Sequence, residues 1–127
     1  GEQALGFLGQ RSDGDSFQSA QALADHVKNL LNRPVTLVDT AQVAIKNIAW
    51  CSGGAQGYFD AAIVAGADAF ITGEISEPQA HYARECGVAF LACGHHASER
   101  YGAPAVAAQV AAQLGLAHEF IDIDNPA

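Results

Sequence analysis

Apolar and polar positions recur along the first third of the chain with two different periods. Ala4–Leu8 is a short apolar run that predicts a strand. The apolar positions between Ala20 and Leu31 are spaced by three and four residues, which places them on one face of a helix. We expect Asp15 or Ser16 to cap the start of this helix and Pro34 to end it. The first third is therefore predicted to be a strand, a polar loop and an amphipathic helix.

From residue 35 onward, short apolar strands and helical stretches follow one another. The strands are predicted at Val35–Val38, Ile45–Cys51, Ala69–Thr72, Val88–Cys93 and Ala117–Ile123. The helices are predicted at Tyr58–Ala65, Pro78–Cys86 and Ala97–Leu114. Gly66 is a suitable stop for the first of these helices, and Ser76 with Gln79 forms a potential capping box for the second. This alternation predicts an α/β fold, a layered sheet with helices on its faces, with right-handed crossovers.

Composition supports one folded α/β domain over residues 1–127 and argues against several binding partners. Half of the residues are hydrophobic and 16% are charged, which suffices to form a core. The formal net charge of −8 disfavours binding to nucleic acid or to an anionic membrane surface, since both depend on cationic side chains. The longest apolar stretch, Phe59–Ala67, is far shorter than the roughly 20 residues of a membrane span.

Cysteine usage and the start of the chain bear on the cellular setting. The three cysteines are an odd number without C-x-x-C spacing, which favours reduced, mostly buried thiols. No signal-peptide pattern opens the chain, so we expect a cytoplasmic protein. The chain begins at Gly1 and contains no methionine, as expected of a processed or trimmed chain or of a piece of a longer protein.

Three loops hold most of the unusual polar residues of the chain. They are Ser52–Gly57, Gly73–Glu77 and Gly94–Glu99, and each follows a predicted strand and precedes a predicted helix. In α/β sheets, ligands bind beyond the carboxyl ends of the strands, where such loops lie. We therefore expect the three loops to converge on a site.

His95 and Glu99 are candidates for metal binding. They are four residues apart, so on a helix that begins near His95 both lie on one face. Imidazole with carboxylate suits Zn, Mn, Fe or Co. The alternative is that His95 and His96 are partly exposed residues at a helix start, where Glu99 complements the helix dipole. Two ligands do not complete a metal site, so further ligands must come from elsewhere.

Glu74 and His81 are candidates for catalytic roles. Glu74 ends a strand, where it can act as a general base, as a hydrogen-bond acceptor for a metal-binding histidine, or as a group that positions water. The alternative is a solvated loop residue. His81 lies one turn into the next predicted helix, near the same end of the sheet. A lone helical histidine is more often a packed or surface residue.

The loop Ser52–Gly57, which follows the predicted strand Ile45–Cys51, contains Gly53 and Gly54. Glycines between a strand and a helix can turn backbone N–H groups towards an anionic cofactor or substrate. A tight turn that only glycine allows is the equally weighted alternative. Cys51 and Cys93 close the neighbouring strands, and we expect them to fill the core rather than to act as nucleophiles.

Four segments in order carry a resemblance to a known family. They are residues 48–54, 68–77, 94–100 and 120–126. The sequence resembles the C-terminal half of the GTP cyclohydrolase type 2 homologues, the Ngg-one-interacting-factor-three-like proteins. The match extends over residues 45–127 and more loosely over residues 1–44.

The resemblance implies a cytosolic α/β protein built from two related halves, with a dinuclear metal centre and a ring-shaped homo-oligomer. His95 and Glu99 match the two metal ligands that the C-terminal half supplies in that family, and Glu74 and His81 fall at positions that line the same cleft. The family's other ligands are a His-His pair and an Asp in the N-terminal half, and nothing in residues 1–47 resembles that segment. The resemblance thus implies the C-terminal part of a chain about twice as long.

The leading hypothesis is a metal-dependent, hydrolase-like protein in which two divalent ions activate water. Glu74 or His81 would assist proton transfer, and the glycine loop would hold an anionic group of a small substrate. GTP ring-opening is implied by the family name, whereas no residue selects guanine. The alternative hypothesis is a non-enzymatic metal-binding protein that acts through oligomerisation and partner contacts.

Overall fold

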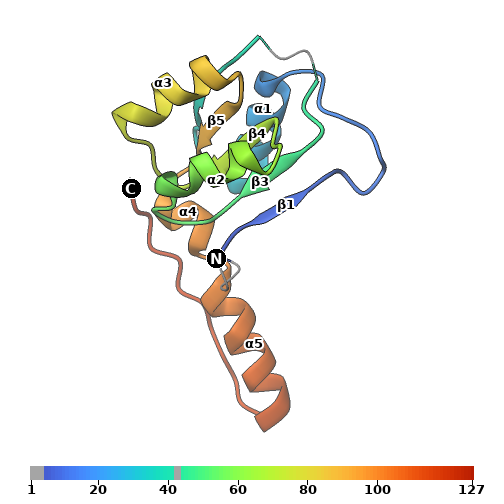
Figure 1. Cartoon of the computed structure of the whole chain (residues 1–127). Helices are drawn as coiled ribbons and strands as arrows, with labels where there is room; N and C mark the ends of the chain where they lie inside the picture. The colour runs from blue at the N-terminus through green and yellow to red at the C-terminus, as the bar shows by residue number, and fades with distance from the viewer. Residues whose placement is uncertain (1–4, 42–43) are drawn as a thin grey trace.

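The chain folds into a five-stranded sheet flanked by helices (Figure 1). The structure, a computed structural model, describes residues 5–41 and 44–127, so Ala4 of the first predicted strand lies outside it. The strands are β1 (Phe7–Gly9), β2 (Thr36–Val38), β3 (Ile48–Trp50), β4 (Ala69–Thr72) and β5 (Ala89–Ala92). The helices are α1 (Ala20–Leu31), the 3-10 turn η1 (Gln56–Tyr58), α2 (Phe59–Val64), α3 (Glu77–Cys86), α4 (His95–Glu99) and α5 (Gly102–Leu114).

The sheet is mixed, with a parallel centre and antiparallel edges. Its strand order is β1-β3-β4-β5-β2. Strands β3, β4 and β5 run parallel, whereas β1 pairs antiparallel with β3 and β2 pairs antiparallel with β5. The parallel centre confirms the predicted α/β class, because helical crossovers join its strands. It also places the carboxyl ends of three neighbouring strands at one edge.

Helices cover both faces of the sheet (Figure 1). Each face has its own hydrophobic core. On one face, α1 buries Leu23 and Val27 against Leu91 of β5. On the other face, which α2 and α3 cover, Phe59 of α2 contacts Phe90 of β5 edge to face, with ring centroids 4.9 Å apart. Because side chains alternate along a strand, neighbouring residues of β5 serve both cores.

The start of α1 differs from the prediction. Ser19 is the N-cap, and its side chain accepts a hydrogen bond from the backbone N–H of Ala22 at 3.1 Å. The prediction of Asp15 or Ser16 was wrong because Phe17 forms an isolated bridge with Ile45, which keeps the chain extended until Ser19.

The start of α3 also differs from the prediction. Ser76 is the N-cap of this helix, but its side chain does not accept the backbone N–H of Gln79. That N–H donates to the Ser76 carbonyl oxygen at 3.2 Å. The Ser76 hydroxyl instead accepts a hydrogen bond from the Gln56 side chain at 3.4 Å. The predicted capping box was therefore wrong, because the Ser76 hydroxyl is hydrogen-bonded to Gln56 and not to the start of its own helix.

The predicted helix Ala97–Leu114 is two helices, α4 and α5. The break at Arg100 has a local cause, since Pro104 has no N–H to donate to the carbonyl of Arg100 and its ring would clash with that carbonyl in a continuous helix. The predicted strand Ala117–Ile123 was wrong, because residues 116–127 form no regular secondary structure. Asp122 binds the side chains of Arg100 at 3.1 Å and His96 at 3.2 Å, so this segment is attached to α4 and not to a sheet edge.

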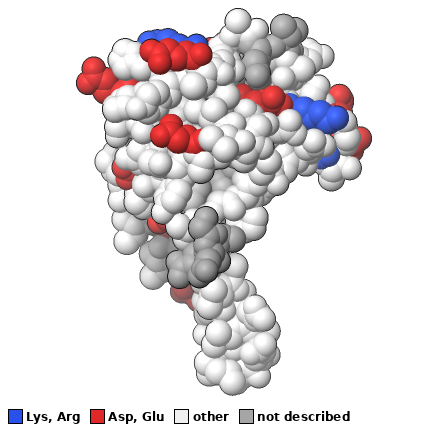
Figure 2. Space-filling view, viewed as in Figure 1, with Lys and Arg blue, Asp and Glu red and all other residues white. Residues whose placement is uncertain are grey.

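Helix α5 extends away from the sheet, and the segment after it runs back along it (Figure 1). Its larger side chains are exposed, with Val106 and Leu114 65% and 68% exposed. The helix contains no Lys, Arg, Asp or Glu, so it forms the uncharged lobe in Figure 2. None of the helices in the described ranges is long and apolar enough to cross a membrane.

Candidate functional site

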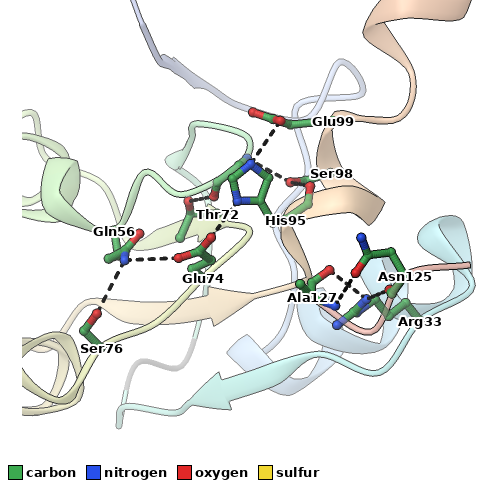
Figure 3. A network of polar contacts seen from close by, with 11 residues as sticks. Arg33, Gln56, Thr72, Glu74, Ser76, His95, Ser98, Glu99, Asn125 and Ala127 are labelled. Carbon is green, nitrogen blue, oxygen red and sulfur yellow. Dashed lines mark hydrogen bonds and ion pairs between the residues drawn. The ribbon is translucent and has the colours of Figure 1, made fainter.

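The three polar loops meet at the carboxyl edge of the parallel strands (Figure 3). The backbone N–H of Gly73, after β4, donates to the carbonyl of Gly53, after β3, at 2.9 Å. The N–H of Gly94, after β5, donates to the carbonyl of Gly73, also at 2.9 Å. The convergence expected from the sequence is confirmed, and backbone hydrogen bonds fix the three loops to one another.

Gly53 allows this close approach. Its φ of +71° lies in the left-handed region, and a Cβ atom there would overlap the carboxylate of Glu99 and lie 3.1 Å from Nε2 of His95. Its backbone is already bonded: the N–H donates to the Ser98 hydroxyl at 2.9 Å, and the carbonyl accepts from the Thr72 hydroxyl at 3.1 Å. These contacts favour the tight-turn interpretation of Gly53.

Gly54 lies beside a carboxylate. A Cβ atom on Gly54 would lie 3.2 Å from Oε1 of Glu74. The negative charge of Glu74 repels an anion that lies next to Gly54, so an anion can bind here only with a cation between it and the carboxylate. The anion-binding role of Gly53 and Gly54 stays a prediction.

The imidazole of His95 lies between two carboxylates. Its Nδ1 is 2.6 Å from Oε1 of Glu74, and its Nε2 is 3.1 Å from Oε2 of Glu99 (Figure 3). Because α4 begins at His95, the spacing of four residues brings Glu99 onto the same side of this helix, as the sequence predicted. Glu74 reaches the ring from the loop after β4. The structure thus brings together three of the predicted site residues.

The two carboxylates alter the titration of the ring. The pKa of His95 is raised above its ordinary 6.5, mainly by the hydrogen bond to Glu74. Partial desolvation lowers this pKa, and the negative charge of Glu99 raises it. The hydrogen bond from His95 in turn is the main cause that lowers the pKa of Glu74 below 4.5. The three side chains are 42–51% exposed, so a ligand can reach them.

The two contacts of the His95 ring differ in length, and this difference predicts which ring nitrogen keeps its proton. A carboxylate can only accept, so the doubly protonated ring donates to both partners. When the ring becomes neutral, we expect the shorter contact to Glu74 to keep the proton on Nδ1, which leaves the lone pair of Nε2 on the side of Glu99. A carboxylate that holds the far N–H of an imidazole is the usual partner of a metal-binding histidine. Among the alternatives for Glu74, the geometry favours this acceptor role.

The donor set is suited to a divalent transition metal. Two ligand atoms bound to one ion at about 2.1 Å lie about 3.0–3.4 Å apart, and Nε2 of His95 and Oε2 of Glu99 are 3.1 Å apart. Within residues 5–41 and 44–127, no group of three or more His, Cys, Asp or Glu side chains is arranged to hold a metal ion. The pair therefore offers two donor side chains, and the expectation that further ligands come from elsewhere stays a prediction.

The remaining histidine candidates lie apart from this cluster. His96 follows His95 in the sequence, but its Nε2 lies 3.2 Å from Oδ1 of Asp122. His81 is exposed on α3, and among the described residues no hydrogen bond or ion pair joins it to His95, Glu74 or Glu99. A catalytic role for His81 stays a prediction.

The cysteines beside the loops are structural. Cys51 and Cys93 are buried, whereas Cys86 is exposed on α3. Burial raises the pKa of Cys93 to about 11, and its thiol donates to the carbonyl of Thr72 at 3.0 Å. Burial is also the main cause that raises the pKa of Cys51. The expectation that these thiols fill the core is confirmed.

Sequence reasoning missed two residues that support the site. The Ser98 hydroxyl donates to the carbonyl of His95 at 3.0 Å while it accepts the N–H of Gly53, so it joins α4 to the glycine loop. The Gln56 side chain donates to Oε2 of Glu74 at 3.4 Å. The spacing of three residues between His95 and Ser98 was a usable signal for the first, whereas Gln56 approaches only through tertiary structure.

Replacing Gly53 by alanine tests the close approach of the loops. We expect Gly53→Ala to lower the free energy of unfolding by about 1–3 kcal/mol, because alanine is strained at positive φ and its methyl group displaces Glu99. Gly57→Ala is the matched control, since a Cβ at Gly57 meets nothing within 4 Å. Urea unfolding of both variants measures the difference. Equal stability of the two variants would contradict the packing role.

Replacing Glu74 by glutamine tests the origin of the raised pKa of His95. We expect Glu74→Gln to lower this pKa in the metal-free protein, because the neutral amide stabilises the imidazolium less than the carboxylate does. An NMR pH titration of the His95 ring measures it, with Glu85→Gln on the exposed end of α3 as control. An unchanged pKa in Glu74→Gln would show that the contact does not govern the ring.

The same pKa shifts give the direction of the pH dependence of stability. Protonated His95 contributes stability below pH 6.5 that is lost as the pH rises through its raised pKa. Ionised Glu74 contributes stability above pH 4.5 that is lost as the pH falls through its lowered pKa. The metal-free wild type should therefore gain most from this contact between about pH 4.5 and 6.5, and Glu74→Gln should lose that gain.

Comparison with solved structures shows similar architectures in longer chains. The structure of protein ybgI, described as of unknown function, matches with a TM-score of 0.91 at 39% sequence identity. The matched region covers 98% of this chain and 50% of the ybgI chain. A Bacillus cereus protein related to NIF3 matches with a TM-score of 0.80 at 22% sequence identity. The matched region covers 98% of this chain and 35% of the Bacillus cereus chain. The second likeness shows the fold alone.

Among the curated sequences that match this chain are proteins named GTP cyclohydrolase 1 type 2 homolog. The protein from Pseudomonas aeruginosa is 53% identical over 104 residues, which cover 82% of this chain and 41% of that protein. The protein from Allochromatium vinosum is 47% identical over 106 residues, which cover 84% and 42%. The chain thus spans about two fifths of the length of these relatives. A family model described as Duf34/NIF3 (NGG1p interacting factor 3) matches residues 2–126, and the chain belongs to this family.

Proposed function

We propose that this chain supplies part of a divalent metal centre in a hydrolase-like protein. The observation that carries the proposal is the imidazole of His95 held between Glu74 and Glu99, with Nε2 next to a carboxylate oxygen. His95 and Glu99 are the proposed ligands. Imidazole with carboxylate suits Zn, Mn, Fe or Co, and the resemblance implies two ions in the complete site.

Each side chain of the cluster has a distinct task in this proposal. Glu74 holds the proton on Nδ1 of His95 and so keeps Nε2 free for the ion. Glu99 would supply a carboxylate donor, and its negative charge would offset the charge of the ion. Divalent ions at such a site supply the activation of a water molecule and the polarisation of a substrate oxygen.

The proposal requires more protein than this chain. Two donors give little chelation, so this chain alone should bind metal weakly. The relatives are more than twice as long as the matched region, and we propose that their additional part supplies the missing ligands. We also propose a ring-shaped homo-oligomer and a small anionic substrate, whose charge the ions would attract past the two glutamates.

A non-enzymatic metal-binding protein is the second candidate. The observation that favours it is helix α5, which carries exposed apolar side chains and no charge, as surfaces that contact other proteins do. Turnover separates the two candidates. Full-length, metal-loaded protein that leaves GTP and phosphoesters unchanged over a long incubation would favour the second one.

Metal content of variants tests the ligand assignment. In the full-length protein, His95→Ala and Glu99→Ala should each reduce the metal bound per chain, because each removes a donor from the same ion. His96→Ala is the matched control, since His96 is adjacent in sequence but faces Asp122. Elemental analysis after gel filtration measures the stoichiometry. Unchanged metal content in both variants, or an equal loss in His96→Ala, would contradict the assignment.

A further inference from the structure

A small apolar cavity lies beside the His95–Glu99 pair on the α1 face of the sheet. Its volume is about 250 Å³. Helix α1 contributes Val27, Leu30 and Leu31 to its wall, and β4 contributes Ile71. Tyr101, which follows α4, lines it as well. We call this cavity the apolar subsite.

The apolar subsite shares its wall with the candidate metal centre. Thr72 and Ser98 line the cavity, and both are hydrogen-bonded to Gly53, at 3.1 Å and 2.9 Å. A Cβ on Gly53 would overlap the carboxylate of Glu99, so Gly53 lies between this carboxylate and two residues of the cavity wall. A molecule bound at the His95–Glu99 pair can therefore place a neighbouring group in the cavity.

Most polar side chains in the wall are already satisfied by protein atoms. The Thr72 hydroxyl donates to the Gly53 carbonyl, and the Ser98 hydroxyl donates to the His95 carbonyl. The Cys93 thiol donates to the Thr72 carbonyl. A nucleobase edge placed here would lose its hydrogen bonds to water without replacement, which costs free energy, whereas an apolar group loses none.

We infer that the apolar subsite binds a hydrophobic or aromatic group of the substrate, and not a guanine base. The size agrees, because an apolar cavity of about 150 Å³ holds benzene. Trp50 and Tyr101 in the wall are 42% and 52% exposed. The Trp50 ring stacks on Phe7 and Arg100 lies over the Tyr101 ring, so at most one face of each ring remains for stacking. The role in a substrate complex rests on the proposed metal centre, whereas binding of the apolar group itself does not need the metal.

Toluene binding to the metal-free protein tests this inference. We expect saturable shifts in the methyl NMR signals of Val27, Leu31 and Ile71. The molecule has a second apolar groove, of about 680 Å³, lined by Ala61 and Ala62 of α2, whose methyl signals report on binding there. Shifts only in these alanine signals, or no saturable shift, would overturn the inference. Guanosine at the same concentration should leave the three reporter signals unchanged, and matching shifts with guanosine would also overturn it.

A matched pair of leucine variants locates the binding. Leu30 in the cavity wall and Leu114 on α5 are 66% and 68% exposed, so Leu→Asn at either position should leave the fold intact. Leu30→Asn should weaken toluene binding by about threefold to tenfold, because apolar contact is lost. Leu114→Asn should not change it, and equal effects of the two variants would overturn the inference.

The two proposals fail separately. Protein that binds toluene in the apolar subsite while its full-length form takes up no metal would contradict only the metal centre. Metal uptake that depends on His95 and Glu99, without toluene binding in the cavity, would contradict only the subsite. His95→Ala should retain toluene binding, since the ring is not part of the cavity wall.

Discussion

The hydrogen bond between Nδ1 of His95 and Glu74 is the contact on which the functional account depends. At 2.6 Å it is shorter than the contact of Nε2 with Glu99 at 3.1 Å, and it comes from a different loop. We expect it to fix the orientation of the ring and to keep the proton of the neutral ring on Nδ1. Without it, the spacing of His95 and Glu99 on α4 would still be present, but the ring would be free to turn.

The fold creates this contact through the parallel order of its central strands. Strands β3, β4 and β5 end at one edge, so the loops carrying Gly53, Glu74 and His95 start side by side. Backbone hydrogen bonds join the loops, and the side chains of Glu99 and His95 leave no room for a side chain at Gly53. The apolar subsite on the α1 face borders the same loop. Architecture, site and adjoining cavity therefore follow from one edge of one sheet.

Local sequence patterns predicted the parts of the structure that depend on local physics. Apolar periodicity located α1, whose bounds are Ala20–Leu31, and apolar runs located the three central strands. Strand ends followed by glycine and polar residues predicted where the loops would converge. The four-residue spacing predicted the pairing of His95 with Glu99. Each of these inferences needs only the geometry of a helix or of a parallel sheet.

The inferences that failed depend on contacts between distant residues. Ser76 does not cap α3 through its side chain because Gln56, 20 residues away, occupies its hydroxyl. The segment after α5 forms no strand because Asp122 is bound to His96 and Arg100. A contact of the same kind places His96, the neighbour of His95, against Asp122. The role of Glu74 also needed tertiary structure, since sequence left three alternatives open.

The tautomer of His95 in the metal-free protein tests the central claim most directly. Long-range proton–nitrogen NMR, recorded at a pH above the raised pKa of the ring, distinguishes the two neutral forms. The account predicts that the proton resides on Nδ1, held by Glu74, and that Nε2 is unprotonated. A ring protonated on Nε2, or an equal mixture of both tautomers, would contradict it.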